Sequence, residues 1–318
     1  MVTIQIISYI AMILPTILSA IGVSLGIGKL GEKTVQALYE QPQAYKEILK
    51  SNIIGSALTE TPSILGLVVS IVLIFHTGSV ADPFVTQMGI IGIGIAMGVS
   101  GGIVGYLSSL PAQSTMTSLA RQPFFANKLL NSMLITQTLS MTPNIFAFVI
   151  SLLIQTHLYS GSGYLMAIQL LSSGLAIGLG SIGPTIGLAT FGSTVCTSMG
   201  TNPKSYTQLL SFTFLCCAII ETPVIFALVI ALSILNPPVE SISQIKDIAF
   251  IGAALCIGLS TIAGGYSAGQ IASTGATCIA QNTEISGAIT RLSLIALAMI
   301  DTFAIYGLIV SMILIIFV

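Results

Sequence analysis

The chain has 318 residues and a formal net charge of −1 at pH 7, with 54% hydrophobic and only 6% charged residues. Soluble domains carry about 25% charged residues, so this composition excludes a water-soluble globular protein. No Asp, Glu, Lys or Arg occurs in four long stretches, residues 1–28, 83–120, 129–203 and 248–283. Only helices and closed barrels satisfy their backbone in lipid, and these uniformly apolar stretches do not alternate as barrel strands do. The sequence therefore predicts an all-α membrane protein.

Eight apolar segments reach the roughly 20 residues that a helix needs to cross the hydrocarbon layer. In chain order they lie near residues 5–28, 51–75, 87–110, 129–155, 164–190, 207–235, 248–270 and 291–318. The first segment lacks a basic flank and is too long for a signal peptide, so we expect it to remain as a membrane anchor.

The polar connections between these segments alternate in charge. Eight of the nine basic residues lie in or beside every second connection, near residues 29–50, 111–128, 191–206 and 271–290. Basic connections face the cytoplasm by the positive-inside rule. Both termini are therefore predicted to lie on the outer side of the membrane.

A repeat of about 80 residues runs through the chain. The motifs TETPSI, SMTPNI, IETPVI and IDTFAI begin at Thr59, Ser140, Ile220 and Ile300, at successive spacings of 81, 80 and 80 residues. A second landmark lies eighteen residues before the second position of each motif, at Pro42, Pro123, Pro203 and Thr283. Such periodicity predicts tandem structural units, here four helical hairpins of one orientation, in residues 1–80, 81–160, 161–240 and 241–318.

The second position of the motif holds an acid in three repeats, Glu60, Glu221 and Asp301, and Met141 in the other. Glu60 lies about ten residues into its segment, or roughly 15 Å deep at 1.5 Å per residue. A charge at that depth costs at least about 2.5 kcal/mol. A carboxyl group that is neutral in lipid and ionises beside water could carry a proton, which is our interpretation. The alternative is a protonated carboxyl that only stabilises the bundle.

Hydrogen-bonding groups follow each motif acid. The next residue is a threonine, Thr61, Thr222 or Thr302, which could bond either to a carboxyl group or to its own helix backbone. A proline lies two residues beyond the motif position in three repeats, and it frees the carbonyl four residues earlier. We hypothesise that this carbonyl could accept the carboxyl proton.

The first helix of each hairpin is rich in glycine, as at Gly22, Gly26, Gly92, Gly187 and Gly265. Small residues let helix backbones approach closely in lipid, so we expect these helices to crowd into an inner layer. The five cysteines show no metal-ligand spacing, and no metal site is expected.

These residues closely resemble the c subunit of F-type ATP synthases. That family has a glycine-rich first helix, a polar loop with Arg-Gln-Pro, and a carboxylate in the middle of the second helix. The stretch GIGKLGEKTVQALYEQPQAYKEILKSNIIGSALTETPSILGLVV is similar to a complete family member, and ARQP at Ala120 to Pro123 matches the family loop. The other repeats keep the same register, so the resemblance covers nearly the whole chain.

The resemblance implies a non-catalytic rotor subunit that forms a ring with other copies of itself in a bacterial inner membrane. The implied partners are membrane lipids, a stator subunit a with two aqueous half-channels, and the central stalk of the catalytic head, but no nucleic acid. The implied ion carriers are Glu60, Glu221 and Asp301. The implied stalk-facing loop residues are Gln41, Pro42, Arg121, Gln122, Pro123, Asn202 and Pro203.

Two departures from the family pattern affect the expected function. Met141 cannot carry a proton, so we expect three ion sites per four hairpins and fewer ions per ATP. No cofactor is expected, and we expect the transported ion to be H⁺ rather than Na⁺, because hard cations need several oxygen ligands. The position that holds Gln in sodium-type members reads Ile27, Ser108, Leu188 and Ala268 here. The threonine after each acid keeps Na⁺ as an open alternative.

Two other functions remain as alternatives. A rotor proteolipid of the V or A type would use the same chemistry, but the Gln-Pro loops argue against it. A secondary ion transporter with internal repeats would commonly have inverted repeats around one central site, whereas these repeats are parallel and each acid lies in its own hairpin.

Overall fold

The structure, a computed structural model, describes residues 2–75, 82–158, 163–237 and 246–317, with side chains from Tyr9 onward. In these ranges eight helical spans are long and apolar enough to cross a membrane. The prediction of an all-α protein with eight spanning helices in four tandem hairpins is thereby confirmed. The hairpins comprise α1 (Val2–Glu40) with α2 (Tyr45–Phe75), α3 (Pro83–Leu107) and α4 (Ser109–Arg121) with α5 (Ala126–His157), α6 (Tyr164–Gly180) and α7 (Ile182–Thr201) with α8 (Tyr206–Leu235), and α9 (Lys246–Gln281) with α10 (Ser286–Phe317).

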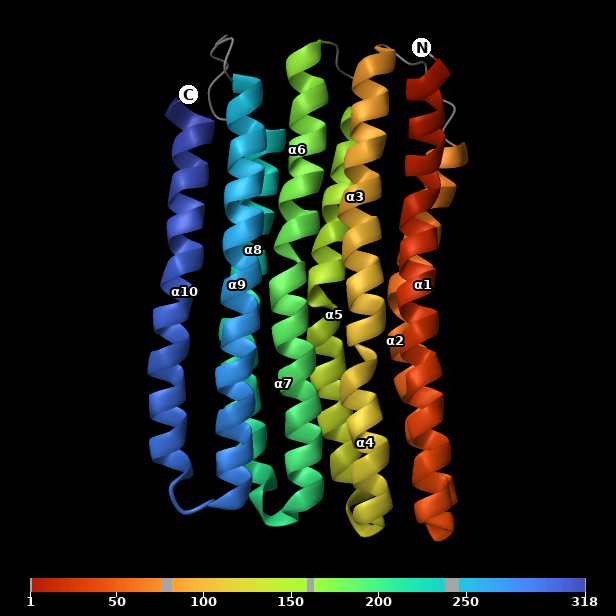
Figure 1. Cartoon of the computed structure of the whole chain (residues 1–318), viewed down its shortest axis with the longest axis vertical. Helices are drawn as coiled ribbons and strands as arrows, with labels where there is room; N and C mark the ends of the chain where they lie inside the picture. The colour runs from red at the N-terminus through yellow and green to blue at the C-terminus, as the bar shows by residue number, and fades with distance from the viewer. Residues whose placement is uncertain (1, 76–81, 159–162, 238–245, 318) are drawn as a thin grey trace.

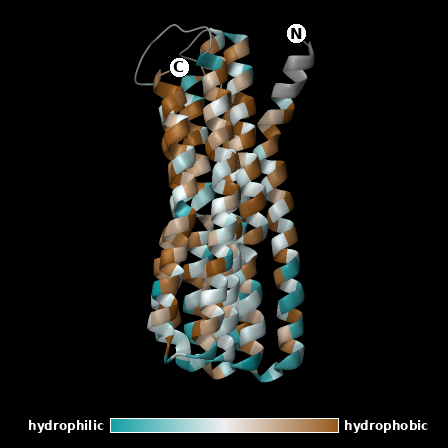
Figure 2. Cartoon of the chain, turned by 60° about the vertical axis from the view of Figure 1, so that its left-hand side comes forward, coloured by the Kyte–Doolittle hydropathy of each residue, from teal (hydrophilic) through white to brown (hydrophobic). Residues whose placement is uncertain are grey.

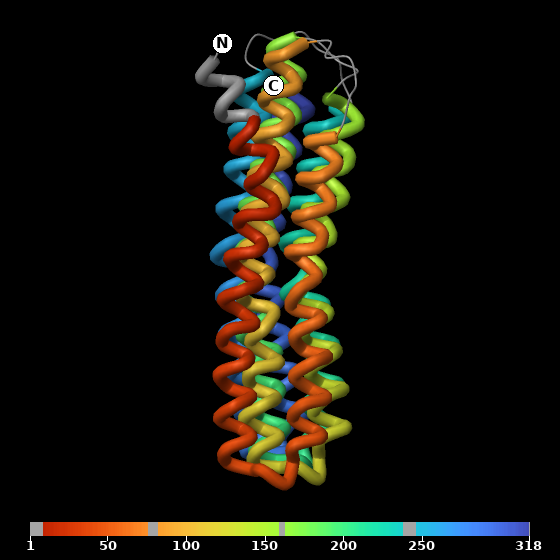
Figure 3. The backbone as a smooth tube through the Cα atoms, turned by 90° about the vertical axis from the view of Figure 1, so that its right-hand side faces the viewer, coloured from red at the N-terminus to blue at the C-terminus, as the bar shows by residue number. Residues whose placement is uncertain are grey.

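The helices form two layers along the length of the molecule. The first-helix layer contains α1, α3 with α4, α6 with α7, and α9, which follow one another from right to left in Figure 1. The second-helix layer contains α2, α5, α8 and α10, and the view along the layers separates the first three of these from α1 (Figure 3). Side chains fill the space between the layers; the rings of Phe191 on α7 and Phe212 on α8, for example, meet edge to face at 5.9 Å.

All four hairpins point the same way. The start of α1 and the end of α10 lie at one end of the molecule, and the turns inside the hairpins lie at the other (Figure 1). Three of these turns are short 3₁₀ helices, Pro42–Ala44, Pro123–Phe125 and Pro203–Ser205. Hydrophilic residues gather at this turn end (Figure 2), in agreement with the clustering of basic residues there.

The first helices extend further than the hydropathy predicted. We expected spans to end near residues 28, 110, 190 and 270, but the helices continue to Glu40, Arg121, Thr201 and Gln281. The prediction of polar connections of about twenty residues is therefore wrong, because most of these residues belong to helices. Polar residues end the hydrophobic stretch of a sequence, but they do not end the helix. A residue before proline does favour the end of a helix, because the helical conformation is disfavoured there. Gln41 and Gln122, with φ of −139° and −135°, each precede a proline and end the helix.

Two first helices are interrupted by a single residue. Ser108 separates α3 from α4, and Ser181 separates α6 from α7. Pro111 and Pro184 lie three residues beyond these breaks, and a proline removes the backbone donor that would bond four residues earlier. The chain continues in nearly the same direction after each break (Figure 1), so both layers remain intact.

Glycines bring the first helices into backbone contact, as predicted. A Cβ atom on Gly92 of α3 would lie 2.6 Å from the Leu170 carbonyl oxygen of α6, and one on Gly26 of α1 would lie 2.8 Å from the Gly105 carbonyl oxygen of α3. Both separations are shorter than any that real side chains adopt. Close packing of this kind stabilises helices in lipid, where the hydrophobic effect between helices is absent.

Asp82 joins two hairpins at the end opposite the turns. Its carboxylate caps α3 by accepting a hydrogen bond from the Phe84 backbone N–H at 2.9 Å, and it accepts a second from the Gly163 N–H at 3.2 Å, next to the start of α6. The Gly163 bond, followed by the Phe84 bond, holds the pKa of Asp82 below its ordinary value of 3.8. Hydrogen bonds to the ionised form favour that form.

This contact predicts an acid-sensitive contribution to stability. Because the folded-state pKa is lowered, the contribution is present above the ordinary pKa and is lost as the pH falls through the lower folded value. We expect Asp82→Ala to lower the thermal unfolding midpoint in detergent at pH 7 by a few degrees, with the difference shrinking below about pH 4. A scan of the midpoint against pH for both chains measures this, and a pH-independent difference would contradict the assignment.

Candidate functional site

The structure places the motif position of all four repeats at the same level. Fifteen residues separate the start of each second helix from the motif residue, from Tyr45 to Glu60 and equally from the starts of α5, α8 and α10 to Met141, Glu221 and Asp301. This places each residue in the middle of its helix and about 22 Å from the turn, at 1.5 Å per residue. The four positions therefore form one level across the second-helix layer.

The acids differ from the methionine in their surroundings. Glu60 is exposed, and Glu221 and Asp301 are half-buried, whereas Met141 is buried with 5% of its surface exposed. The acids are thus at least partly accessible from outside the helix layers, whereas the methionine is enclosed.

A hydroxyl from the neighbouring hairpin contacts Asp301. Thr222 on α8 places its Oγ1 atom 2.7 Å from Oδ1 of Asp301 on α10. Thr222 directly follows Glu221 in the chain, but adjacent residues of a helix do not face each other. The threonine therefore serves the acid of the next hairpin rather than the acid beside it in sequence.

The same hydroxyl lies close to a second acceptor. Thr222 Oγ1 is 2.8 Å from the backbone carbonyl oxygen of Ile219, which has no helical N–H partner because Pro223 stands four residues later. A threonine hydroxyl has one hydrogen to donate. Each contact has its own hydrogen when Thr222 donates to Ile219 and accepts from a protonated Asp301, whereas with an ionised Asp301 the one hydroxyl hydrogen is shared between two acceptors. The geometry therefore fits a neutral carboxylic acid at this level.

The next site along the layer brings together the equivalent two residues. The Glu221 carboxyl group interacts with the hydroxyl of Thr142 on α5. Thr142 lies 80 residues before Thr222, and Glu221 lies 80 residues before Asp301. Two sites in succession therefore pair the acid of one hairpin with the threonine of the hairpin before it.

The junction of the first two hairpins has a different chemistry. The equivalent two residues at this junction are Thr61 and Met141, and Met141 supplies no carboxyl group. One turn earlier, the buried Gln137 of α5 donates from Nε2 to the Gly55 carbonyl oxygen and to Thr59 Oγ1 of α2, both at 2.8 Å. Our sequence analysis missed Gln137, although an amide in an apolar span is itself a signal of a buried hydrogen bond.

The first and last hairpins each carry one member of an acid–threonine pair without the other. Among the hairpins that the structure describes, none precedes that of Glu60 to supply a threonine. Thr302 of α10 is exposed and donates to the Met299 carbonyl oxygen at 2.6 Å, and none of the described hairpins places an acid beside it. The two half-sites lie on opposite edges of the molecule (Figure 1).

The residues that the sequence assigned to the stalk-facing loops gather at the turn end. Gln41 and Pro42, Gln122 and Pro123, and Asn202 and Pro203 begin the three 3₁₀ turns, and Arg121 ends α4. Asn202 also links two hairpins, since its Nδ2 donates to the Ala280 carbonyl oxygen of α9 at 2.8 Å.

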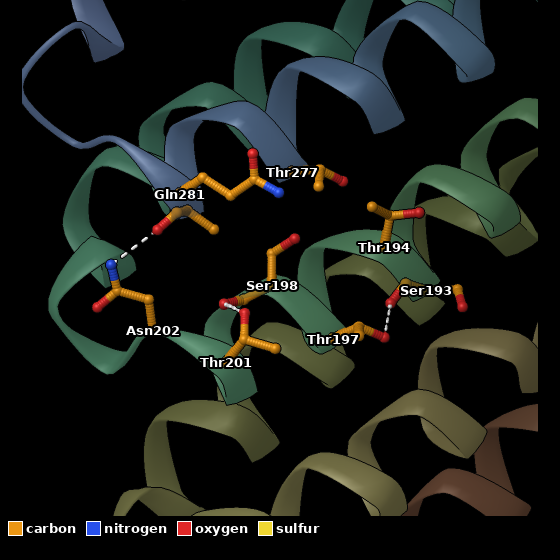
Figure 4. Close-up of a pocket in the computed structure, with 9 residues that line it drawn as sticks. Ser193, Thr194, Thr197, Ser198, Thr201, Asn202, Thr277 and Gln281 are labelled. Carbon is orange, nitrogen blue, oxygen red and sulfur yellow. Dashed lines mark hydrogen bonds between the residues drawn. The ribbon is translucent and has the colours of Figure 1, made fainter.

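A hydroxyl-rich groove of about 490 Å³ lies near this end between α7 and α9 (Figure 4). Thr197 and Thr201 donate to the carbonyl oxygens of Ser193 and Ser198 in their own helix. The groove is lined by Ser193, Thr194, Thr197, Ser198, Thr201, Asn202, Thr277, Ala280 and Gln281. No lining residue is ionisable, so this groove is distinct from the carboxylate level and marks where the first-helix layer becomes polar.

Comparison with known proteins agrees with this geometry. The family profile of the ATP synthase C subunit matches the chain four times, over residues 10–73, 91–154, 171–234 and 251–314. Each match covers both helices of one hairpin and includes one motif position.

Individual relatives match one repeat's length of the chain. The ATP synthase c subunit of Clostridium novyi (strain NT) is 36% identical over 63 residues, which is 20% of this chain and 75% of the relative. The corresponding protein of Mycoplasma genitalium is 36% identical over 64 residues, or 20% of this chain and 63% of the relative. That of Clostridium beijerinckii is 42% identical over 57 residues, or 18% of this chain and 80% of the relative. With four tandem profile matches over most of its length, the chain belongs to the ATP synthase C subunit family.

Proposed function

We propose that this chain is the rotor-ring c subunit of a rotary F-type ATP synthase and carries protons on Glu60, Glu221 and Asp301. Each carboxyl group would load a proton from one aqueous half-channel of a stator subunit, cross the lipid while neutral, and release the proton into the other. The movement of the ring would turn the central stalk and couple proton flow to ATP synthesis or hydrolysis.

The contact between Thr222 and Asp301 carries the proposal. The hydroxyl has an acceptor at Ile219 and a carboxyl oxygen at 2.7 Å, an arrangement that satisfies every group when the acid is protonated. A neutral, hydrogen-bonded acid can face lipid at a small cost, whereas an ionised one needs water or a cation. Exchange between the two forms at the stator would give the transport step.

The available ligands support protons over sodium. Sodium, like other hard cations, requires several oxygen ligands. Ile27, Leu188 and Ala268, at the position that supplies a glutamine in sodium-type members, bring no side-chain oxygen. One carboxyl group, one hydroxyl and one freed carbonyl are sufficient to hold a proton.

A second copy of the chain would complete the site of Glu60. If the α8 to α10 packing is repeated between chains, Thr302 of one copy takes the place of Thr222 and faces Glu60 of the next. Apolar side chains on these edges, such as Ile64 at 52% and Phe303 at 62% exposure, would be covered by the same contact. This supports a closed ring whose hairpin number is a multiple of four, provided that this chain alone fills it.

The charge pattern supports a topology. The turns with most of the basic residues would face the cytoplasm and dock on the central stalk, and both termini would face outward in a bacterial inner membrane. Met141 leaves one hairpin in four without a carrier. Three protons per four hairpins would therefore be moved, which lowers the number of protons per ATP and requires a larger driving force for synthesis.

Labelling with a hydrophobic carbodiimide tests this function, because the reagent attacks protonated carboxyl groups in apolar surroundings. We expect peptide mapping to find adducts on Glu60, Glu221 and Asp301 in purified membranes, with rates that fall as the pH rises. Glu47 and Glu284 in the polar turn regions are the controls and should stay unlabelled. Protection of the three acids by sodium would contradict proton carriage, and labelling of the controls alone would contradict the carrier assignment.

A further inference from the structure

The turn of the second hairpin carries two phenylalanines directly after its proline. After its proline the turn of the second hairpin reads Phe124 and Phe125, where the first turn has Gln43 and Ala44 and the third has Lys204 and Ser205. The Phe124 side chain is fully exposed, at 105% of its reference area. A large apolar side chain at the polar end of a membrane protein costs free energy in water, which burial against a partner recovers.

The residue after Phe124 belongs to a cluster of two aromatic rings and a lysine. The ring of Phe125 meets that of Tyr206 at the start of α8 edge to face, with centroids 5.7 Å apart. The ammonium group of Lys128 lies 5.2 Å from the first centroid and 5.0 Å from the second, a cation–π arrangement. These contacts join the second and third hairpins and hold the base of the turn in one geometry. A partner would therefore meet a preformed surface, which lowers the entropic cost of binding.

The charge around this turn has one sign. Arg121, Lys128 and Lys204 surround it, and the sequence contains no Asp or Glu between Asp82 and Glu221. The turns of the first and fourth hairpins mix both signs, with Glu40 and Glu47 in one and Glu284 in the other. The surface of Phe124, Arg121, Lys128 and Lys204, called here the Phe124 patch, thus favours an acidic partner.

The depth of the patch argues for a protein rather than lipid tails. The turn lies about 22 Å from the carboxylate level along the helix axis, whereas half of a hydrocarbon layer is about 15 Å. With the carboxylates near the middle of the membrane, Phe124 lies beyond the apolar layer. It can be buried there by a water-soluble protein that covers the turn end.

We infer that the Phe124 patch binds an acidic, apolar-pocketed surface of the soluble stalk, once per four hairpins. This inference rests on the proposed rotor function and adds that the four turns are unequal. Phe124 supplies the apolar anchor, and the three basic side chains attract and orient the partner. The turns of the first and fourth hairpins contribute little to the affinity. A fused chain permits this division, since its hairpins differ in sequence.

The test is rebinding of the soluble ATP-hydrolysing assembly to membrane vesicles from which it has been washed away, measured as sedimented ATP hydrolysis. We expect Phe124→Ser to weaken rebinding at least about tenfold, as for the loss of an interface hot spot. Tyr39→Ser is the matched control, because Tyr39 is an aromatic residue of the first hairpin that is 87% exposed at the same end. It should change rebinding less than about twofold. Lys204→Glu should weaken rebinding at low salt, with a smaller effect at high salt.

The outcomes distinguish a failure of the Phe124 patch inference from a failure of the proposed rotor function. Equal losses from Phe124→Ser and Tyr39→Ser, or no loss from either while the assembly still binds, would overturn the inference and leave the rotor function standing. Binding of the unaltered purified chain, but not of Phe124→Ser, to protein-free anionic vesicles would show a lipid-binding patch instead. Failure of the assembly to bind the unaltered vesicles would contradict the rotor function itself.

Discussion

Proton conduction should fall to the leak of protein-free vesicles when all three acids are replaced by amides, as Glu60→Gln, Glu221→Gln and Asp301→Asn. An amide keeps the shape of the side chain and can still bond to a threonine hydroxyl, but it cannot release a proton near neutral pH. Because the motif position of the second hairpin holds Met141 and no acid, no carrier would remain. The measurement is pH change in vesicles that contain the ring and its stator.

The methionine provides a control at the same level of the membrane. Met141→Leu conserves an apolar side chain of similar size in a buried site, and we expect it to leave conduction unchanged. The single change Asp301→Asn should reduce the carriers per chain from three to two. Conduction that survives the triple change would refute proton carriage by this level of the molecule.

Assembly of the chain should be lost when a bulky side chain is placed between the first helices. In Gly92→Leu the new Cβ would clash with the carbonyl oxygen of Leu170, and the backbone of α6 would have to move. We expect the free energy of unfolding to fall by about 3 kcal/mol, which is the upper end of the usual range for overpacked cores. The measurement is the thermal unfolding midpoint in detergent, together with the yield of folded protein.

The control is a glycine of a second helix that contacts nothing. A Cβ on Gly287 of α10 would have no atom within 4 Å, so Gly287→Leu should leave the unfolding midpoint within a few degrees. Similar losses at both glycines would mean that leucine itself is harmful in these helices. The close approach of α3 and α6 would then not be the cause.

Local patterns were enough to place the three acids within the apolar spans. The apolar length of each segment and the repeat spacing predicted the eight spans, the hairpin order and the common level of Glu60, Glu221 and Asp301. The hydropathy of a segment depends only on residues that are close in sequence, so it can be evaluated without knowledge of the fold. The ends of the first helices were less predictable, because polar residues after the span still form helix until Gln41 or Gln122 meets a proline.

Contacts between hairpins could not be obtained in the same way. The sequence places Thr222 beside Glu221, but the structure places its hydroxyl on Asp301, 79 residues away. Neighbouring residues diverge around a helix, so their partners depend on which helix lies opposite. The amide of Gln137 that joins α5 to α2 likewise has meaning only once those helices are side by side.

The sequence by itself determined a membrane-spanning chain of four hairpins with three acids and one methionine at one level, because length, hydropathy and repeat spacing are properties of the chain. Only the tertiary structure decided that Asp301 bonds to the threonine of the preceding hairpin and that Glu60 and Thr302 remain on opposite edges. Those assignments depend on the order and the rotation of helices within a layer. Both are set by the close packing of glycine-rich surfaces and not by any local pattern.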